Sequence, residues 1–277
     1  MKLSKHHGLG NDFLVYDDTE GKRPLSTELA SVLCNRRLGV GADGIMRMSA
    51  LDGAVKMELR NADGSPAEMS GNGIRCLAQA GIRSGLVEGP SFVVVSVVGE
   101  RRISLLGRSG STDFIEVDMG EVVLTEDPPG LEKVLEMGEG PTYLGALSVS
   151  VGNPHLVLQL GTEGELAGLD AAAEGSRIEA ALGCNVEWVV PRSAATLAMK
   201  VFERGVGVTA ACGTGSVAVA LAAREWGLGG DSFEVENPGG VLGVRLEGGR
   251  AALAGPATHV GDVEVDEEWL SEALGCL

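Results

Sequence analysis

Two short segments place a side chain that can exchange a proton beside paired glycines. They are SGNG at 70–73 and CGTG at 212–215, and apolar residues at helical spacing follow each one. Backbone N–H groups are free at the start of a helix and stabilise anions there. The pattern therefore predicts a lowered pKa for the Cys212 thiol and a cradle for the carboxylate of a ligand. Glycines that only permit a tight turn are the ordinary alternative, but the pattern occurs twice, which favours the chemical interpretation.

Other polar side chains stand at expected turns or strand ends, where they could contribute to a site. Glu203 and Arg204 would ordinarily form a solvated pair, but they precede Cys212 within one expected strand-loop-helix unit and could reach the same pocket. An asparagine beside glycine or proline is most often a turn residue, because it favours left-handed and Asx-turn geometry. The remaining candidates are Asn11, Asn61, Asn153 with His155, and Asn185.

The elements that must position these residues are short. With 42 glycines and 4% aromatic residues, the chain is typical of many strands separated by tight turns. Alternating or β-branched apolar residues predict strands at 13–16, 55–60, 91–98, 102–106, 114–119, 147–151, 186–190, 198–202 and 241–246. Alanine and leucine at helical spacing predict helices at 26–37, 74–84, 216–226 and 267–274. We therefore predict an α+β fold.

The two glycine-rich loops also indicate how the chain is organised. One lies in each half of the sequence, and 277 residues are enough for two domains. The acidic, proline-bearing stretch at 125–130 is typical of a surface connection. We expect a first half at 1–118, joined by the C-terminal tail 263–277, and a second half at 119–262.

Charge and hydropathy exclude several classes of partner. The net charge of −17 would repel a nucleic-acid backbone. Residues 1–13 lack the apolar core of a signal peptide, and apolar runs such as 92–98 are too short to span a membrane. The five cysteines are odd in number and lack the paired spacing of a zinc site. We expect a cytoplasmic protein without a nucleic-acid or membrane partner.

Six motifs in register carry a resemblance along nearly the whole chain. They are HGLGNDF at 7–13, RNADGS at 60–65, GNGIRC at 71–76, GNPH at 152–155, ERGVG at 203–207 and ACGTG at 211–215. Together they resemble the motif series of the diaminopimelate epimerase family. The resemblance implies two pseudo-symmetric domains, each a sheet wrapped around one apolar helix, with the active site in the cleft between them and a homodimer as the assembly.

The resemblance also implies a reaction and the residues that carry it. The family epimerises LL-diaminopimelate to meso-diaminopimelate without pyridoxal phosphate, metal or another cofactor. One cysteine removes the α-proton and a second delivers a proton to the opposite face. By resemblance, Cys212 is one base, Ser70 stands at the position of the other, and His155 and Glu203 assist proton transfer. The implied substrate-binding positions are Asn11, Asn61, Gly71, Asn72, Asn153, Asn185, Arg204, Gly213 and Thr214.

Ser70 is the main departure from the family pattern, because that position normally holds the first of the two cysteines. A hydroxyl is a far weaker acid than a thiol, whose pKa is about 8.5, and supplies almost no base near neutrality. Cys76 lies further along the helix and matches a packing position. Val208, where many members have Glu, and Gly44, where some have Gln, are milder departures that leave the exact amino-acid substrate open.

Three interpretations of Ser70 follow. The serine is an engineered or impairing replacement in an ordinary epimerase, or it belongs to a one-thiol relative that catalyses another α-proton reaction, such as a dehydratase or a different racemase. In the third interpretation the chain binds an amino acid without catalysis. Retention of Cys212, His155 and Glu203 argues against the third.

Overall fold

The computed structural model describes residues 1–51, 53–67, 70–137 and 141–275. One of the five cysteines, Cys276, lies outside the described residues. The chain divides into two compact units. Unit 1 comprises Met1–Val117 with Gly255–Leu277, and unit 2 comprises Asp118–Ala254.

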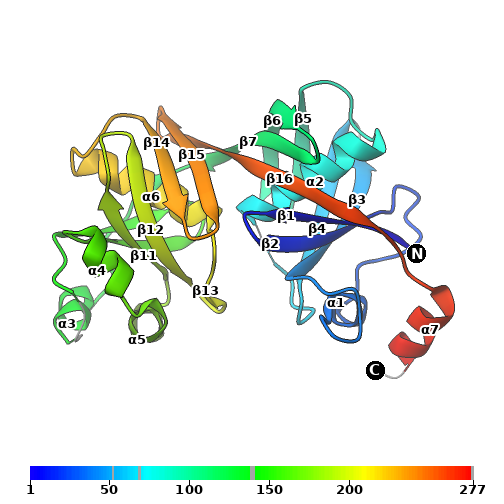
Figure 1. Cartoon of the computed structure of the whole chain (residues 1–277), viewed down its shortest axis with the longest axis horizontal. Coiled ribbons are helices and arrows are strands. Elements are labelled where there is room, and N and C mark those ends of the chain that lie inside the picture. Colours follow the sequence, from blue (N-terminus) through cyan, green and yellow to red (C-terminus); the bar gives the residue numbers. More distant parts are fainter. Residues whose placement is uncertain (52, 68–69, 138–140, 276–277) are drawn as a thin grey trace. The chain divides into compact units, whose positions relative to one another are not determined.

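Unit 1 is a sheet wrapped around helix α2 (Gly71–Ser84) (Figure 1). Its strands are β1 (Lys2–Gly8), β2 (Asn11–Asp17), β3 (Gly44–Leu51), β4 (Ala54–Asn61), β5 (Ser91–Ser96), β6 (Gly99–Ser109), β7 (Thr112–Glu121) and the end of β16 (Arg250–Glu264). They are hydrogen-bonded in the order β1 to β7, and β16 pairs with β1. Helix α2 contacts β1, β2, β3 and β4.

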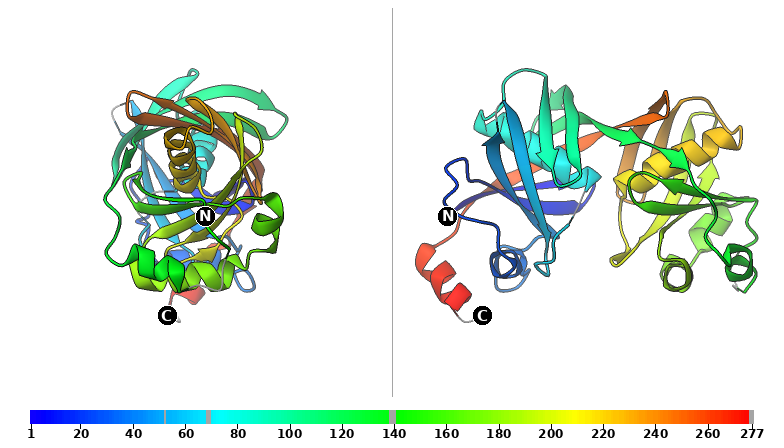
Figure 2. Two further views of the ribbon diagram at one scale, coloured as in Figure 1. Left: turned by 90° about the vertical axis from the view of Figure 1, so that its left-hand side faces the viewer. Right: turned by 180° about the vertical axis from the view of Figure 1, so that it is seen from behind.

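Unit 2 follows the same plan around helix α6 (Gly213–Glu225), which lies against the strands of its own unit (Figure 2). Its strands are β8 (Val123–Leu124), β9 (Gly145–Ser150), β10 (Pro154–Gln159), β11 (Asn185–Pro191), β12 (Thr196–Glu203), β13 (Gly207–Val208), β14 (Ser232–Asn237), β15 (Gly240–Glu247) and the start of β16. Their order is β8, β9, β10, β11, β12, β14, β15, β16, and β13 pairs with β12.

Strand directions confirm the duplicated α+β fold. In unit 1, β1–β2 is antiparallel, β2–β3 parallel, β3–β4 antiparallel, β4–β5 parallel and β5–β6 antiparallel. In unit 2, the pairs β9–β10, β10–β11, β11–β12, β12–β14 and β14–β15 repeat this series. Each central helix also follows the fourth strand of its series, so each unit brings the same kind of loop to the same end of its sheet.

The central helices begin earlier than the apolar pattern predicts. We expected starts at 74 and 216, whereas α2 begins at Gly71 and α6 at Gly213. The reason is capping: the side chains of Ser70 and Cys212 accept hydrogen bonds from backbone N–H groups of the first turn, which holds the glycines in helical geometry. At its other end, α2 stops at Gly85, whose φ of 75° is the left-handed conformation that glycine tolerates.

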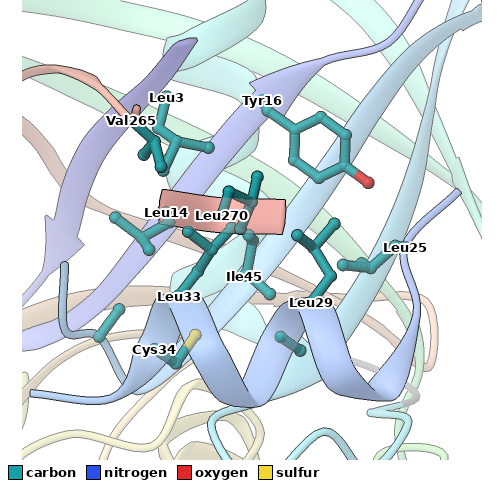
Figure 3. Packing of buried hydrophobic residues seen from close by; sticks show 12 residues of the cluster. Leu3, Leu14, Tyr16, Leu25, Leu29, Leu33, Cys34, Ile45, Val265 and Leu270 are labelled. Carbon is teal, nitrogen blue, oxygen red and sulfur yellow. The ribbon is translucent and has the colours of Figure 1, made fainter. Parts of the chain in front are cut away.

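Shorter helices build a second apolar layer in each unit. In unit 1, Leu29 and Leu33 of α1 (Thr27–Cys34) point towards Leu14 and Ile45, and Leu270 of α7 (Glu267–Gly275) joins the same cluster (Figure 3). In unit 2, the corresponding layer includes α3 (Leu131–Glu136), α4 (Glu163–Gly168) and α5 (Ala171–Leu182), which pack around a fully buried tryptophan, Trp188. The strands β1, β3, β8, β10, β13, β14 and β16 and the helices α3, α4 and α5 have no counterpart among the predicted elements.

The division between the units differs in part from the expected one. The first division, at Val117/Asp118, lies beside the expected boundary at 118/119. The second lies at Ala254/Gly255 rather than at 262/263. The reason is that β16 pairs with β15 up to Ala254 and with β1 from Thr258 onwards, so one long strand serves both units. No helix in the described part of the chain is long and apolar enough to cross a membrane.

Candidate functional site

Cys212 is the N-cap of α6. Its Sγ accepts a hydrogen bond from Gly215 N–H at 3.3 Å and lies 3.5 Å from Thr214 Oγ1. Its backbone is also fixed, because Ser216 Oγ donates to Cys212 O at 2.8 Å and Asn237 Oδ1 accepts from Cys212 N–H at 3.4 Å. The sulfur is therefore held at a helix start, where a negative charge would be stabilised by the first N–H groups.

The predicted lowering of the Cys212 pKa is wrong for this structure. Burial raises the thiol pKa well above its ordinary value, and the nearby carboxylates of Glu203 and Glu187 raise it further. The hydrogen bonds from Thr214 and Gly215 act in the opposite direction but are outweighed. Desolvation disfavours a buried anion more strongly than a single helix terminus favours it. Cys212 therefore rests as a protonated thiol.

Glu203 is placed to exchange a proton with that thiol. Burial raises the pKa of its carboxyl, while hydrogen bonds with Thr209 and Cys212 lower it in part. The Thr209 hydroxyl donates to Glu203 Oε1 at 2.5 Å. A thiol and a carboxyl that share a hydrogen bond, with their pKa values shifted by the same buried environment, can pass a proton between them.

His155 lies in the same part of unit 2, at the start of β10. Its Nδ1 is 2.7 Å from Glu187 Oε1, and its Nε2 is 3.0 Å from Asn153 Oδ1. The side chains of His155 and Glu187 are both fully buried. Electrostatic interactions link Glu203 with Glu187 and His155, and Cys212 with both glutamates. We refer to Cys212, Glu203, His155 and Glu187 as the unit 2 acid–base cluster.

Asn185 and Arg204 flank the cluster. The Asn185 side chain donates to Pro154 O at 2.9 Å and accepts from Arg204 N–H at 2.9 Å, so it ties the ends of three neighbouring strands together. The Arg204 guanidinium donates to Gly183 O at 3.3 Å. The structure thus brings Asn153, Asn185 and Arg204 to the strand ends beside the cluster, and Gly213 and Thr214 to the first turn of α6.

In unit 1, the loop before α2 is hydrogen-bonded through the side-chain amides of Asn11 and Asn72 and the buried guanidinium of Arg75. Ser70 Oγ accepts from Gly73 N–H at 3.0 Å, as Cys212 Sγ does from Gly215. Asn72, in the first turn of α2, donates to Asn11 Oδ1 at 3.4 Å and accepts from Arg75 Nη2 at 2.7 Å. Burial lowers the pKa of Arg75 to about 10, so its guanidinium stays charged at neutral pH. Asn11, Gly71 and Asn72 therefore lie beside Ser70, and the Asn11 side chain also donates to Asp43 Oδ2 at 2.9 Å.

Strand register shows which residues of unit 1 match the cluster of unit 2. In unit 1, Phe13 pairs with Gly44, and Gly44 pairs with Asn61. Asn61 ends β4, where its side chain donates to Ser65 Oγ at 3.0 Å. Met46 lies two positions further along β3 than Gly44, on the same face because side chains alternate along a strand.

In unit 2, His155 pairs with Asn185. Glu203 is the next residue beyond the Val186–Phe202 pair on β12, so it stands opposite Asn185. Glu187 lies two positions beyond Asn185 on β11, on the same face. The matched positions in units 1 and 2 are thus Phe13 and His155, Met46 and Glu187, Asn61 and Glu203, and Ser70 and Cys212. Each titratable member of the unit 2 cluster therefore corresponds to a non-titratable residue or a hydroxyl at the matched position of unit 1.

Three residues of these networks, Glu187, Arg75 and Asn237, were not predicted from the sequence. Glu187 has no exposed side-chain surface. The Asn237 side chain accepts from the backbone N–H of Cys212 and donates to Ser216 Oγ, so it holds the Cys212 loop in place. The available signal for Glu187 was a charged residue in the middle of an apolar strand, NVEWVV at 185–190, where burial of a charge needs a partner. No group of His, Cys, Asp and Glu within the described ranges is arranged to hold a metal ion.

Known structures with the same fold include epimerases and related proteins of low sequence identity. The chain matches the crystal structure of a Bacillus anthracis phenazine biosynthesis protein of the PhzF family with a TM-score of 0.73 at 14% identity, covering 96% of this chain and 99% of that one. A hydroxyproline epimerase from Agrobacterium vitis matches with a TM-score of 0.68 at 16% identity, over 96% and 90% of the two chains. These likenesses show a shared two-unit α+β fold.

The sequence model of diaminopimelate epimerase matches residues 3–125 and 147–260. A diaminopimelate epimerase from Mycobacterium ulcerans is 38% identical over 97% of this chain and 98% of its own length. The chain belongs to the diaminopimelate epimerase family and is an isomerase.

Proposed function

We propose that this protein interconverts LL-diaminopimelate and meso-diaminopimelate by moving the proton on one α-carbon. Membership of the diaminopimelate epimerase family, with relatives matched over nearly their full length, is the observation that carries this proposal. The unit 2 acid–base cluster supports it, because a thiol, a carboxyl and an imidazole within one buried network suit proton transfer to and from carbon.

Cys212 acts in this proposal as the base that removes the α-proton. The thiol first passes its own proton to the Glu203 carboxylate, and the resulting thiolate accepts the α-proton of the substrate. The carbanion that forms is stabilised by the first N–H groups of the central helices, which bind the substrate carboxylate. His155 assists proton transfer. Ser70 occupies the position from which the second proton would come, and its weakly acidic hydroxyl makes this step, and therefore inversion, slow.

Substrate binding falls to the residues around these groups. Asn11, Asn61 and Asn72 with Gly71 form the unit 1 contribution in this proposal. Asn153, Asn185, Arg204, Gly213 and Thr214 form the unit 2 contribution. The support lies in their placement: within each unit they lie at strand ends or in the first turn of the central helix, beside its N-cap.

We also propose that the enzyme works in the cytoplasm as a homodimer, with a small amino acid as its ligand. The absence of a membrane-spanning helix in the described residues fits this proposal, and the net charge of −17 fits the expectation that no nucleic acid binds. Sedimentation of the purified protein tests the assembly, and a mass corresponding to one chain at working concentration would contradict the dimer.

Two measurements test the reaction itself. Calorimetry should detect binding of LL- and meso-diaminopimelate, whereas lysine and proline should give no heat at the same concentration. In heavy water, one of the two isomers should incorporate deuterium at its α-carbon. Absence of both binding and exchange would refute the assignment, and exchange followed by loss of ammonia or water would favour a one-thiol lyase instead.

A further inference from the structure

Glu187 and His155 form a buried pair that the central part of β11 and the start of β10 bring together. Glu187 Oε1 lies 2.7 Å from His155 Nδ1, and neither side chain has exposed surface. The second oxygen, Oε2, is buried and has no hydrogen-bond partner among the described residues. A carboxyl group left half-satisfied in an apolar interior is destabilising, so its presence needs an explanation.

Helix α6 lies beside the Glu187–His155 pair, and its Gly215 leaves space for the Glu187 side chain. A Cβ on Gly215 would lie 2.6 Å from Glu187 Oε1, closer than van der Waals contact allows. The N–H of the same glycine donates to Cys212 Sγ. Gly215 thus admits the carboxylate beside the helix and binds the sulfur of the neighbouring N-cap.

Unit 1 shows that the fold does not require this pair. The matched positions there hold Phe13 and Met46, which are both buried, so the same sheet and helix close over an apolar pair. A hydrophobic replacement of a buried ion pair is often neutral or stabilising. Packing therefore does not account for Glu187 and His155, and a role in the chemistry of unit 2 does.

The hydrogen bonds specify what that role is. An ionised carboxylate only accepts, so the proton in the contact must be on Nδ1 of His155. Nε2 is then the nitrogen that gains and loses a proton, and a carboxylate on the far side of the ring stabilises the imidazolium whenever Nε2 is protonated. Asn153 can hydrogen-bond to Nε2 whether or not this nitrogen is protonated, because its carboxamide can present either Oδ1 as an acceptor or Nδ2 as a donor.

We propose that Glu187 is a positioning residue of the unit 2 acid–base cluster, which keeps a proton on Nδ1 of His155 and leaves Nε2 as its working nitrogen. This inference rests on the proposed function. Glu187 makes no contact with the reacting atoms in it. The proton that Nε2 accepts during turnover is returned from Nε2, so Glu187 neither gains nor loses one.

Two variants test the proposal. Glu187→Met introduces the residue found at the matched position of unit 1, and Glu187→Gln keeps the shape without the charge. The control is Glu174→Gln, which removes a carboxylate of the same unit that accepts from Tyr143 and Arg177 instead. With the ring nitrogens of histidine labelled, NMR of the parent should show His155 protonated at Nδ1 at neutral pH. Glu187→Met should lose this single tautomer, whereas Glu174→Gln should keep it.

The alkylation rate of Cys212 is a second readout, and Glu174→Gln is the control for exposure of the buried thiol by unfolding. Because the Glu187 charge raises the Cys212 pKa, both Glu187 variants should alkylate faster at Cys212, by about tenfold at pH 8 for each unit of pKa removed. In Glu187→Met, deuterium exchange into substrate should meanwhile fall by at least about tenfold, because the imidazole is no longer oriented.

The outcomes separate the two proposals. If the parent exchanges no substrate proton, the proposed reaction fails, while the tautomer still decides the role of Glu187. An Nδ1 proton retained in Glu187→Met would overturn the positioning role, and an unchanged alkylation rate would show only that the Glu187 charge does not set the acidity of Cys212. If Glu174→Gln lost the Nδ1–H tautomer and deuterium exchange to the same extent, the effects of the Glu187 variants would be due to destabilisation of the fold.

Discussion

Ser70 and Cys212 hold the same place in their units: each is the N-cap of the central helix, and each side chain accepts a hydrogen bond from the N–H three residues further on. Only the acidity of the two side chains differs. Around Cys212 lie three further titratable side chains, whereas the matched positions around Ser70 hold Phe13, Met46 and Asn61. We therefore expect proton transfer to be efficient from one side of the substrate only.

Ser70→Cys should restore inversion. In the parent, the carbanion made by Cys212 mostly regains its proton from the same side, so one isomer exchanges deuterium with little change of configuration. Replacing a group that donates a proton in the transition state changes rates by about 10²- to 10⁴-fold, so the variant should gain inversion by a factor of that order. Chiral chromatography of the product in heavy water measures it.

Comparable inversion by the parent and by Ser70→Cys would mean that another residue is the second base. Cys76 is a poor candidate, because it is fully buried in α2 and burial raises its pKa to about 12. Cys76→Ser in the parent provides the control and should leave inversion unchanged.

Glu203→Gln should make Cys212 more reactive and the enzyme less active. The Glu203 charge raises the thiol pKa, so its removal lowers that pKa and increases the thiolate fraction below it. In the parent, the alkylation rate of Cys212 should keep rising with pH beyond 9, because the thiol is protonated until its raised pKa is reached. In Glu203→Gln the same rise should occur at lower pH. Mass-spectrometric mapping of carbamidomethylated cysteines at several pH values checks this.

Turnover should fall in Glu203→Gln despite the more acidic thiol, because the residue that takes up the thiol proton is lost. A loss of about 10²-fold or more is expected. Glu247→Gln, at an exposed strand end, serves as the control and should match the parent in both assays. Unchanged thiol reactivity in Glu203→Gln would show that the Glu203 charge does not set the acidity of Cys212.

Gly215→Ala should destabilise the protein, because its Cβ would lie 2.6 Å from Glu187 Oε1. Overpacking of this kind costs about 1–3 kcal/mol of the free energy of unfolding. Gly81→Ala is the matched control, since its Cβ would be 3.6 Å from its nearest neighbour and removing a helix-interior glycine stabilises by about 0.5–1 kcal/mol. Urea unfolding of both variants gives the comparison.

The same change in a Glu187→Ala background should no longer be destabilising, because the oxygen that the Cβ would meet is gone. If Gly215→Ala still lowers the free energy of unfolding in the Glu187→Ala background, glycine is required there by the helix backbone and not by Glu187.

His6 should make stability fall as the pH drops below about 6.5. Burial lowers its pKa to about 4, although Gln79 hydrogen-bonds to Nδ1 and Asp262 opposes the shift, while His259 and Arg83 add to it. The unfolded chain therefore binds the proton more readily than the folded chain. As a result, the free energy of unfolding decreases as the pH falls from 6.5 to 4. Between pH 7 and pH 5 the loss from this group is about 2 kcal/mol.

In His6→Gln the free energy of unfolding should depend less on pH over this range, whatever its value at pH 7. Urea unfolding at pH 7 and pH 5 measures the difference for parent and variant. An equal decrease in both proteins would assign the acid sensitivity to other groups.

The sequence by itself determined the features that depend on neighbours along the chain. The loops at 70–73 and 212–215 begin helices because a capping side chain and glycines stand next to an apolar helical pattern, and this signal is local. The duplication was visible for the same reason, since the two loops repeat one short pattern. The six motifs were sufficient to indicate the family that the comparisons then showed.

Tertiary structure alone decided the acidity of the site and the partners of its residues. Glu187 meets His155 because β11 pairs with β10, and Asn185 joins Pro154 to Arg204 because β12 lies on the other side of β11. The direction of the Cys212 pKa was mispredicted for the same reason. A helix start is a local feature that favours the thiolate, whereas desolvation and the charges of Glu203 and Glu187 act through space, and a sequence does not show which distant strands will close around a sulfur atom.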